Sequence, residues 1–198
     1  ELVDVCKAYN GRPVLAGVNL RIEHGERVGM IGKNGAGKSV LLRLLMALET
    51  PDQGEIRLGP SIKIAYYAQE HDTLVMEQTL LEAVRYAGNL NEPNAVSFLG
   101  RYLFTYKQAS QKIKELSGGE RSRLQLALIV LSKANFLLLD EPTNNLDIAS
   151  AEVLENALED FEGTAFLISH DRYFLDQVVD RLLVLDAGQV TSYQGGYS

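Results

Sequence analysis

Short apolar runs of the kind that form strands dominate the first third of the chain. Runs rich in Val, Ile and Leu are 2–5, 18–22, 27–31, 55–58 and 63–67. After His71 the apolar spacing becomes helical: Thr79 precedes the periodic run LLEAVRYA, and residues 94–104 hold aromatics without an obvious strand. We therefore expect a strand-rich N-terminal part, followed by a small helical subdomain over residues 70–115.

Helix-like and strand-like segments alternate in the last third of the chain. The helix-like segments are 121–131, 148–161 and 173–178, and the strand-like segments are 136–139, 165–168 and 182–185. Such alternation predicts a parallel sheet with crossover helices. The predicted fold is α/β with a mainly parallel sheet, in one domain over 1–198 whose core combines residues 1–69 and 116–198.

Composition places the chain among globular proteins. It has 198 residues, of which 46% are apolar and 23% charged, as is usual for one domain. Its apolar runs are far shorter than the roughly 18 to 20 residues that span a bilayer, so we expect no membrane insertion.

The single cysteine, Cys6, and the lack of a secretory signal favour a cytoplasmic setting. Because the chain starts at Glu1 within a strand-like run, we expect a longer parent protein.

The charge balance argues against a broad nucleic-acid surface. The formal net charge is −7, whereas nucleic-acid binding requires many cationic side chains to displace counterions. A nucleotide carried with Mg²⁺ needs only a few local donors, so the acidic balance leaves that class of site open.

The segment GKNGAGKS, residues 32–39, fits the phosphate-binding pattern G-x-x-x-x-G-K-[ST] between a strand and a helical run. Its glycines let backbone N–H groups converge on phosphate oxygens, and the helix adds its positive end. Lys38 is expected to reach the β- and γ-phosphates, and Ser39 to ligate Mg²⁺. A glycine-rich turn without a ligand is the plainer alternative. The expected nucleotide contacts are Gly32, Asn34, Gly35, Ala36, Gly37, Lys38, Ser39 and Val40.

An apolar strand ends abruptly in two acids, Asp140 and Glu141. Ligands bind at the carboxyl edge of parallel sheets, so Asp140 is predicted to orient the Mg²⁺ shell. Glu141 is predicted to polarise the water that attacks the γ-phosphate. Seen alone, the pair could also be a strand end with solvated charges.

The segment LSGGE, residues 116–120, supports two interpretations together. Ser117 and Glu120 fit the capping box that starts many helices. The paired glycines, Gly118 and Gly119, also give an anion close access to backbone amides at a helix N-terminus.

Taken in order, these motifs resemble the ATP-binding cassette (ABC) ATPase family along essentially the whole chain. GKNGAGKS is similar to the Walker A loop, FLLLDE to Walker B and LSGGE to the family signature. Gln69 resembles the Q-loop glutamine, residues 144–147 the D-loop, His170 the switch histidine and Tyr9 the aromatic residue that stacks on adenine. Taken singly, Tyr9, Gln69 and His170 each have plainer structural explanations.

The resemblance implies a P-loop NTPase (RecA-like) core with an N-terminal antiparallel β subdomain. It also implies a head-to-tail pair of cassettes with ATP between them. Ser117, Gly118 and Gly119 of one cassette would complete the site of the other. His170 would contact the γ-phosphate, and Gln69 would sense the metal or the water. Val40 stands where the family usually has a second hydroxyl, a loss worth about 0.5 to 1.5 kcal/mol of nucleotide binding for one net hydrogen bond.

Further strings resemble the ABC-F group of tandem-cassette proteins that act on the ribosome. They are the signature with Glu120, DEPTNNLD, SHDRYFLDQVVDR and the tail SYQGGYS, although Asn145 stands where many ABC-F cassettes have His. The short interval from Gln69 to Ser117 is more similar to a second cassette than to a first. The implied function is ATP-driven cassette closure on the ribosome, through segments outside this chain. The alternatives are the motor of an ABC membrane transporter and a nucleotide-gated dimerisation module with little hydrolysis.

Overall fold

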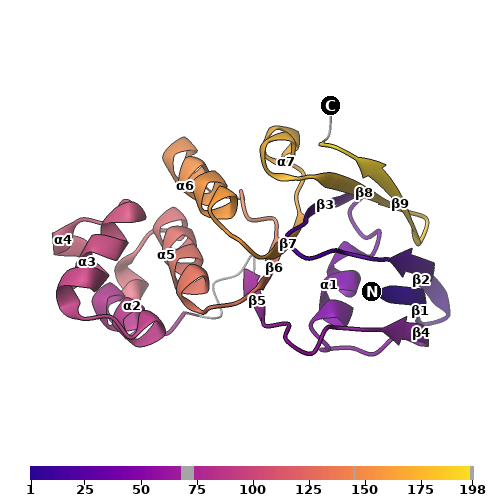
Figure 1. Ribbon diagram of the computed structural model, residues 1–198, viewed down its shortest axis with the longest axis horizontal. Helices are drawn as coiled ribbons and strands as arrows, with labels where there is room; N and C mark the ends of the chain where they lie inside the picture. The colour runs from indigo at the N-terminus through magenta and orange to yellow at the C-terminus, as the bar shows by residue number, and fades with distance from the viewer. Residues whose placement is uncertain (68–73, 145, 197–198) are drawn as a thin grey trace.

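The computed structural model describes residues 1–67, 74–144 and 146–196. A six-stranded sheet with the strand order β5-β6-β7-β3-β8-β9 lies at its centre (Figure 1). Its strands are β3 Arg27–Gly32, β5 Ile64–Tyr67, β6 Phe136–Asp140, β7 Thr164–Ile168, β8 Arg181–Asp186 and β9 Gln189–Gln194. Neighbouring strands pair in parallel from β5 to β8, and only the β8–β9 pair is antiparallel. The predicted α/β fold with a mainly parallel sheet is confirmed.

A smaller antiparallel sheet with the order β2-β1-β4 comes from the N-terminal part. Its strands are β1 Leu2–Tyr9, β2 Arg12–Leu20 and β4 Gln53–Ile56. The antiparallel N-terminal sheet is confirmed, but β1 and β2 are longer than their apolar runs indicated. Their exposed ends pair through backbone groups, as Tyr9 does with Arg12, and such pairing requires no apolar side chains.

The helices have local sequence signals at their starts. They are α1 Lys38–Leu45, α2 Leu80–Gly88, α3 Glu92–Arg101, α4 Tyr106–Ala109, α5 Gly118–Leu131, α6 Ile148–Glu159 and α7 Arg172–Val178, with a short 3₁₀ turn at Ile113–Glu115. Thr79 and Glu82 form a reciprocal capping box at α2, and Asn91 caps α3. Such side chains satisfy the free N–H groups of a first helical turn.

Alternating side chains of the central strands face two separate cores. Leu137 and Leu139 of β6 belong to the core shared with helices α2, α5 and α6. Leu138 and Phe166 belong to the core that contains the leucines of α1 and the inner face of the small sheet. Both faces of the central sheet are thus covered, which explains why β6 and β7 are almost continuously apolar.

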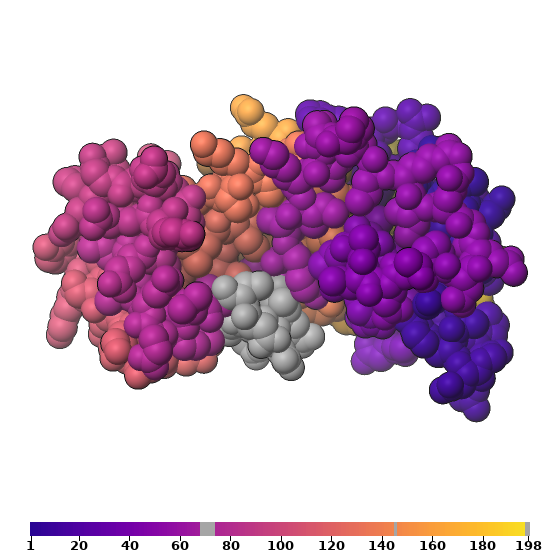
Figure 2. Space-filling view, turned by 90° about the horizontal axis from the view of Figure 1, so that it is seen from below, coloured from indigo at the N-terminus to yellow at the C-terminus, as the bar shows by residue number. Residues whose placement is uncertain are grey.

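The helices α2 to α5 form one end of an elongated molecule, and the small sheet lies at the other end (Figures 1 and 2). Leu80 and Val84 of α2 share a core with Leu124 of α5, so the helix that follows LSGGE packs with the preceding helices. The subdomain boundaries at 70 and 115 stay a prediction. Within the described ranges, no helix is long and apolar enough to cross a membrane.

Candidate functional site

The loop between β3 and α1 has the backbone that its glycines favour. Gly35 and Gly37 have φ angles of 78° and 111°, in the region that costs residues with a Cβ the most. A Cβ at Gly37 would lie 2.6 Å from Val14 Cγ1, because β2 packs against the loop. The segment therefore curls tightly and leads into the N-terminus of α1, as the phosphate-binding pattern predicts.

Lys38 lies inside this loop rather than on the surface. Lys38 is only 8% exposed, and its Nζ donates to the carbonyl oxygens of Gly32 and Lys33 at 2.7 and 3.3 Å. The same Nζ lies 3.5 Å from His170 Nε2. A cation from the start of α1 and a histidine after β7 are thus neighbours, although 132 positions separate them.

The two acids lie at the carboxyl end of β6, next to β7. Asp140 pairs in register with Ile168, and the backbone N–H of Glu141 donates to the Ile168 carbonyl at 2.8 Å. Glu141 has a φ of 48°, a backbone conformation that costs about 1 to 3 kcal/mol and is concentrated at functional sites. This backbone turn directs the Glu141 carboxylate toward the segment that follows β7.

Glu141 and His170 contact each other through two pairs of atoms. The backbone N–H of His170 donates to Glu141 Oε2 at 3.1 Å, and His170 Nε2 lies 3.4 Å from Glu141 Oε1. Burial raises the pKa of Glu141, while the contacts with His170 lower it to a smaller extent. A carboxylate with a raised pKa beside an imidazole can accept and release a proton.

Asp140 is partly buried beside Lys38 and Tyr66. Burial raises the pKa of Asp140, and the Lys38 charge and the Tyr66 hydroxyl partly oppose this shift. Burial likewise raises the pKa of Tyr66, and the nearby Asp140 charge adds to it. The ionised Asp140 is thus an incompletely solvated anion, which favours contact with a cation.

Asp140→Asn is expected to increase the free energy of unfolding at pH values above the unfolded pKa of aspartate. A carboxyl whose folded pKa is raised stabilises the fold below its unfolded pKa, and this contribution is lost as the pH rises through the folded pKa. The amide carries no such charge, so the variant should become more stable relative to the wild type as the pH rises above about 4, the unfolded pKa of aspartate. Urea unfolding at several pH values measures the difference. A variant that is less stable than the wild type across that range would show that Lys38 and Tyr66 fully compensate the Asp140 charge.

One cavity of about 540 Å³ brings most of the predicted nucleotide residues together. Its lining consists of Val14, Asn34, Gly35, Gly37, Lys38, Ser39, Val40, Asp140, Glu141, Asn144 and His170. Phosphate-loop donors, two carboxylates and an imidazole therefore face the same space. Ser39 and Asp140 suit Mg²⁺, which takes one or two protein oxygens and completes its shell with phosphates and waters.

The signature residues Ser117, Gly118 and Gly119 do not line this cavity, and neither do Gly32 and Ala36 of the phosphate loop. Ser117 caps α5 in a reciprocal capping box with Glu120, which confirms the capping prediction, and Gly118 and Gly119 form the first turn. These residues are absent from the described cavity lining. Within one chain, the signature and the phosphate loop therefore form separate sites.

The remaining predicted residues have varied positions. Tyr9 ends β1 and donates its hydroxyl to Glu49, and it does not line the cavity. Gln69 and Asn145 lie outside the described residues. Asp147 caps α6 by accepting the Ser150 N–H at 2.8 Å.

Sequence reasoning missed two residues of the site. Val14 lines the cavity, but it lies in the part of β2 that precedes the expected apolar run 18–22. Tyr66 contacts Asp140 because β5 and β6 pair, and in this part of the sequence only Gln69 was identified as a candidate. Strand pairing decides both positions, and no local signal could have identified them.

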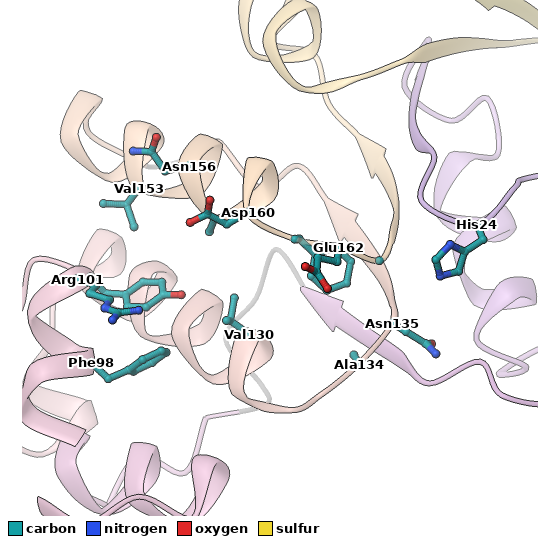
Figure 3. Close-up of a pocket in the computed structure, with 14 residues that line it drawn as sticks. His24, Phe98, Arg101, Val130, Ala134, Asn135, Val153, Asn156, Asp160 and Glu162 are labelled. Carbon is teal, nitrogen blue, oxygen red and sulfur yellow. The ribbon is translucent and has the colours of Figure 1, made fainter. Parts of the chain in front are cut away.

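A larger cavity of about 710 Å³ lies between helices α3, α5 and α6 (Figure 3). It opens near the amino ends of β6 and β7, away from the two acids, and Phe98, Arg101, Val130 and Asp160 are among its lining residues. None of the lining residues belongs to the predicted phosphate loop, the paired acids or the switch histidine. Residue chemistry rather than volume thus identifies the smaller cavity as the candidate site.

Comparison with known proteins agrees with this geometry. The family model described as ABC transporter matches residues 15–144. The chain is 43% identical to the putative ATP-binding protein YdiF of Bacillus subtilis over 98% of its own length and 30% of that protein. It is 40% identical to the energy-dependent translational throttle protein EttA of Haemophilus influenzae, over 100% of the chain and 37% of EttA. The chain thus spans about a third of these relatives.

A solved structure shares the whole fold. The ATP-binding cassette MJ0796, in a dimeric post-hydrolysis state bound to ADP and Pi, superposes with a TM-score of 0.79 at 27% identity. The alignment covers 98% of this chain and 97% of that one. The cavity that is lined by the phosphate loop, the paired acids and the histidine lies within a cassette fold. The family model covers most of the residues that line this cavity. The chain therefore belongs to the ABC transporter family as one of its ATPase domains.

Proposed function

We propose that this chain is an ATP-hydrolysing cassette of an ABC-F type protein, in which head-to-tail closure on a second cassette acts on the ribosome. The observation that carries the proposal is the divided site. The cavity with Lys38, Glu141 and His170 lacks the signature residues among its described lining, while the N-terminus of α5 offers separate anion donors. A second cassette would supply those donors to the ATP.

Each side chain of the cavity has a proposed role in hydrolysis. Mg²⁺, when bound, would neutralise charge on the β- and γ-phosphates, with Ser39, Asp140 and Gln69 as its proposed protein contacts. Lys38 would bind the same phosphates. Glu141 would accept a proton from the attacking water, and His170 would contact the γ-phosphate from the end of β7.

The role in translation rests on similarity along the whole chain. EttA, which matches all of this chain, is described by its name as an energy-dependent translational throttle protein. The ABC-F strings around Glu120, Asn144 and His170 support the same assignment, together with a cytoplasmic setting. The ribosome would be bound through segments of the parent protein outside this chain.

The test is cosedimentation of the full-length parent with ribosomes. A Glu141→Gln variant should retain ATP, and it should therefore remain with the ribosomes in the presence of ATP and leave them without it. A parent protein that never cosediments, with either the wild-type or the Glu141→Gln cassette, would exclude the translation role. Hydrophobic spans next to this cassette in the parent would then favour a transporter motor.

A further inference from the structure

Glu49 connects the end of strand β1 to helix α1. One oxygen of its carboxylate accepts the hydroxyl of Tyr9, and the other accepts Arg43 Nε at 2.6 Å. Arg43 lies in the last turn of α1, the helix that starts at the phosphate loop. A single carboxylate therefore holds the Tyr9 hydroxyl against this helix.

Both elements joined by this carboxylate also border the nucleotide cavity. Val40 lines the cavity, and Arg43, three residues further along α1, lies on the same side of the helix. On the other side, Val14 lines the cavity from β2, the strand that pairs with β1 and its Tyr9. The Tyr9 ring is thus attached to two walls of the nucleotide cavity.

A second set of contacts fixes the strand end that carries Tyr9. Lys7 Nζ lies 5.7 Å from the centroid of the Tyr9 ring, and it donates to the Thr50 carbonyl at 2.8 Å. Asp52 binds Lys7 Nζ at 3.1 Å and the Ala8 N–H at 2.7 Å. The Tyr9 residue remains 39% exposed, so the ring is fixed while part of it stays open to a ligand.

A ring held in one orientation is well suited to stacking. Stacking of a base on an aromatic side chain is worth about 1 to 3 kcal/mol, and a ring that is already ordered loses less entropy on binding. The Tyr9 hydroxyl and the Arg43 guanidinium hold the pKa of Glu49 below its usual value. The carboxylate therefore stays ionised at neutral pH and keeps both partners.

We propose that Glu49 and Arg43 are positioning residues for base recognition, because they fix the Tyr9 ring in the orientation that stacks on adenine. This inference rests on the proposed function, together with the resemblance of Tyr9 to the aromatic residue that stacks on adenine in this family. Neither residue lines the phosphate cavity. Their effect is therefore confined to ligands that carry a base.

The test compares Mg·ATP with magnesium tripolyphosphate, which has the phosphates but no base. Calorimetry on Tyr9→Phe and on Glu49→Ala should show ATP binding weakened about three- to tenfold, as for one lost hydrogen bond. The double variant should bind ATP as tightly as the single variant that has the lower ATP affinity, because both changes remove one shared interaction. Tripolyphosphate affinity should stay within about twofold of the wild type, since the phosphate contacts remain.

Glu55→Ala is the matched control. Glu55 is an exposed carboxylate of the same small sheet, paired with Arg57, and its loss should leave both affinities unchanged. Equal weakening of ATP and tripolyphosphate by Glu49→Ala would mean a purely structural role and would overturn the inference. The inference would also be overturned if Tyr9→Phe and Glu49→Ala both kept the wild-type ratio of ATP affinity to tripolyphosphate affinity. If Lys38→Ala also left both ligands bound, the proposed phosphate site would fail too.

Discussion

Lys38→Ala is expected to abolish detectable nucleotide binding. The Nζ of Lys38 lies at the loop carbonyls and 3.5 Å from His170, inside the cavity where the phosphates would bind. A hydrogen bond to a charged group contributes about 1.5 to 3 kcal/mol, and the uncompensated phosphate charge adds to the loss. The hydrogen bond alone corresponds to about tenfold to a hundredfold in affinity, so with the added charge loss calorimetric titration with Mg·ATP should show no measurable binding.

Lys33→Ala is the matched control for this variant. Lys33 belongs to the same loop and carries the same charge, but its side chain is exposed. Its removal should leave ATP affinity nearly unchanged, because surface charges are screened by solvent. Unchanged affinity in Lys38→Ala, with circular dichroism showing a folded protein, would refute the role given to Lys38.

Glu141→Gln is expected to slow phosphate release by about a hundredfold to ten-thousandfold, the usual contribution of a positioned general base. The amide preserves the size of the side chain, but it cannot accept the proton from water. ATP binding should persist, since Lys38 and the loop amides remain. Phosphate release should be measured at several protein concentrations, because a site completed by a second cassette depends on association.

Glu152→Gln provides the comparison for the same chemical change. Glu152 is an exposed residue of α6, away from the cavity, and its variant should release phosphate at the wild-type rate. If Glu141→Gln released phosphate at that rate too, another group would have to be the base. His170, which lies 3.4 Å from the Glu141 carboxylate, would be the next residue to replace.

The central elements followed from sequence because each depends on its own residues. β6 and β7 are almost continuously apolar, and both are buried on two faces. By contrast, β9 escaped prediction because five of its six residues are exposed. Among the described residues it is an edge strand whose one partner is β8, and backbone hydrogen bonds can hold such a strand without an apolar pattern.

The sequence by itself determined the local chemistry: the phosphate loop around Lys38, the acids after β6 and the cap at Ser117. Each is a contiguous motif whose geometry depends on adjacent residues. Only the tertiary structure decided that Lys38 and His170 become neighbours across 132 positions, and that Glu49 holds Tyr9. These contacts depend on the sheet order, in which β3 lies directly beside β7. Strand order is set by packing of the whole domain, because a local pattern fixes which faces are buried but not which strands pair.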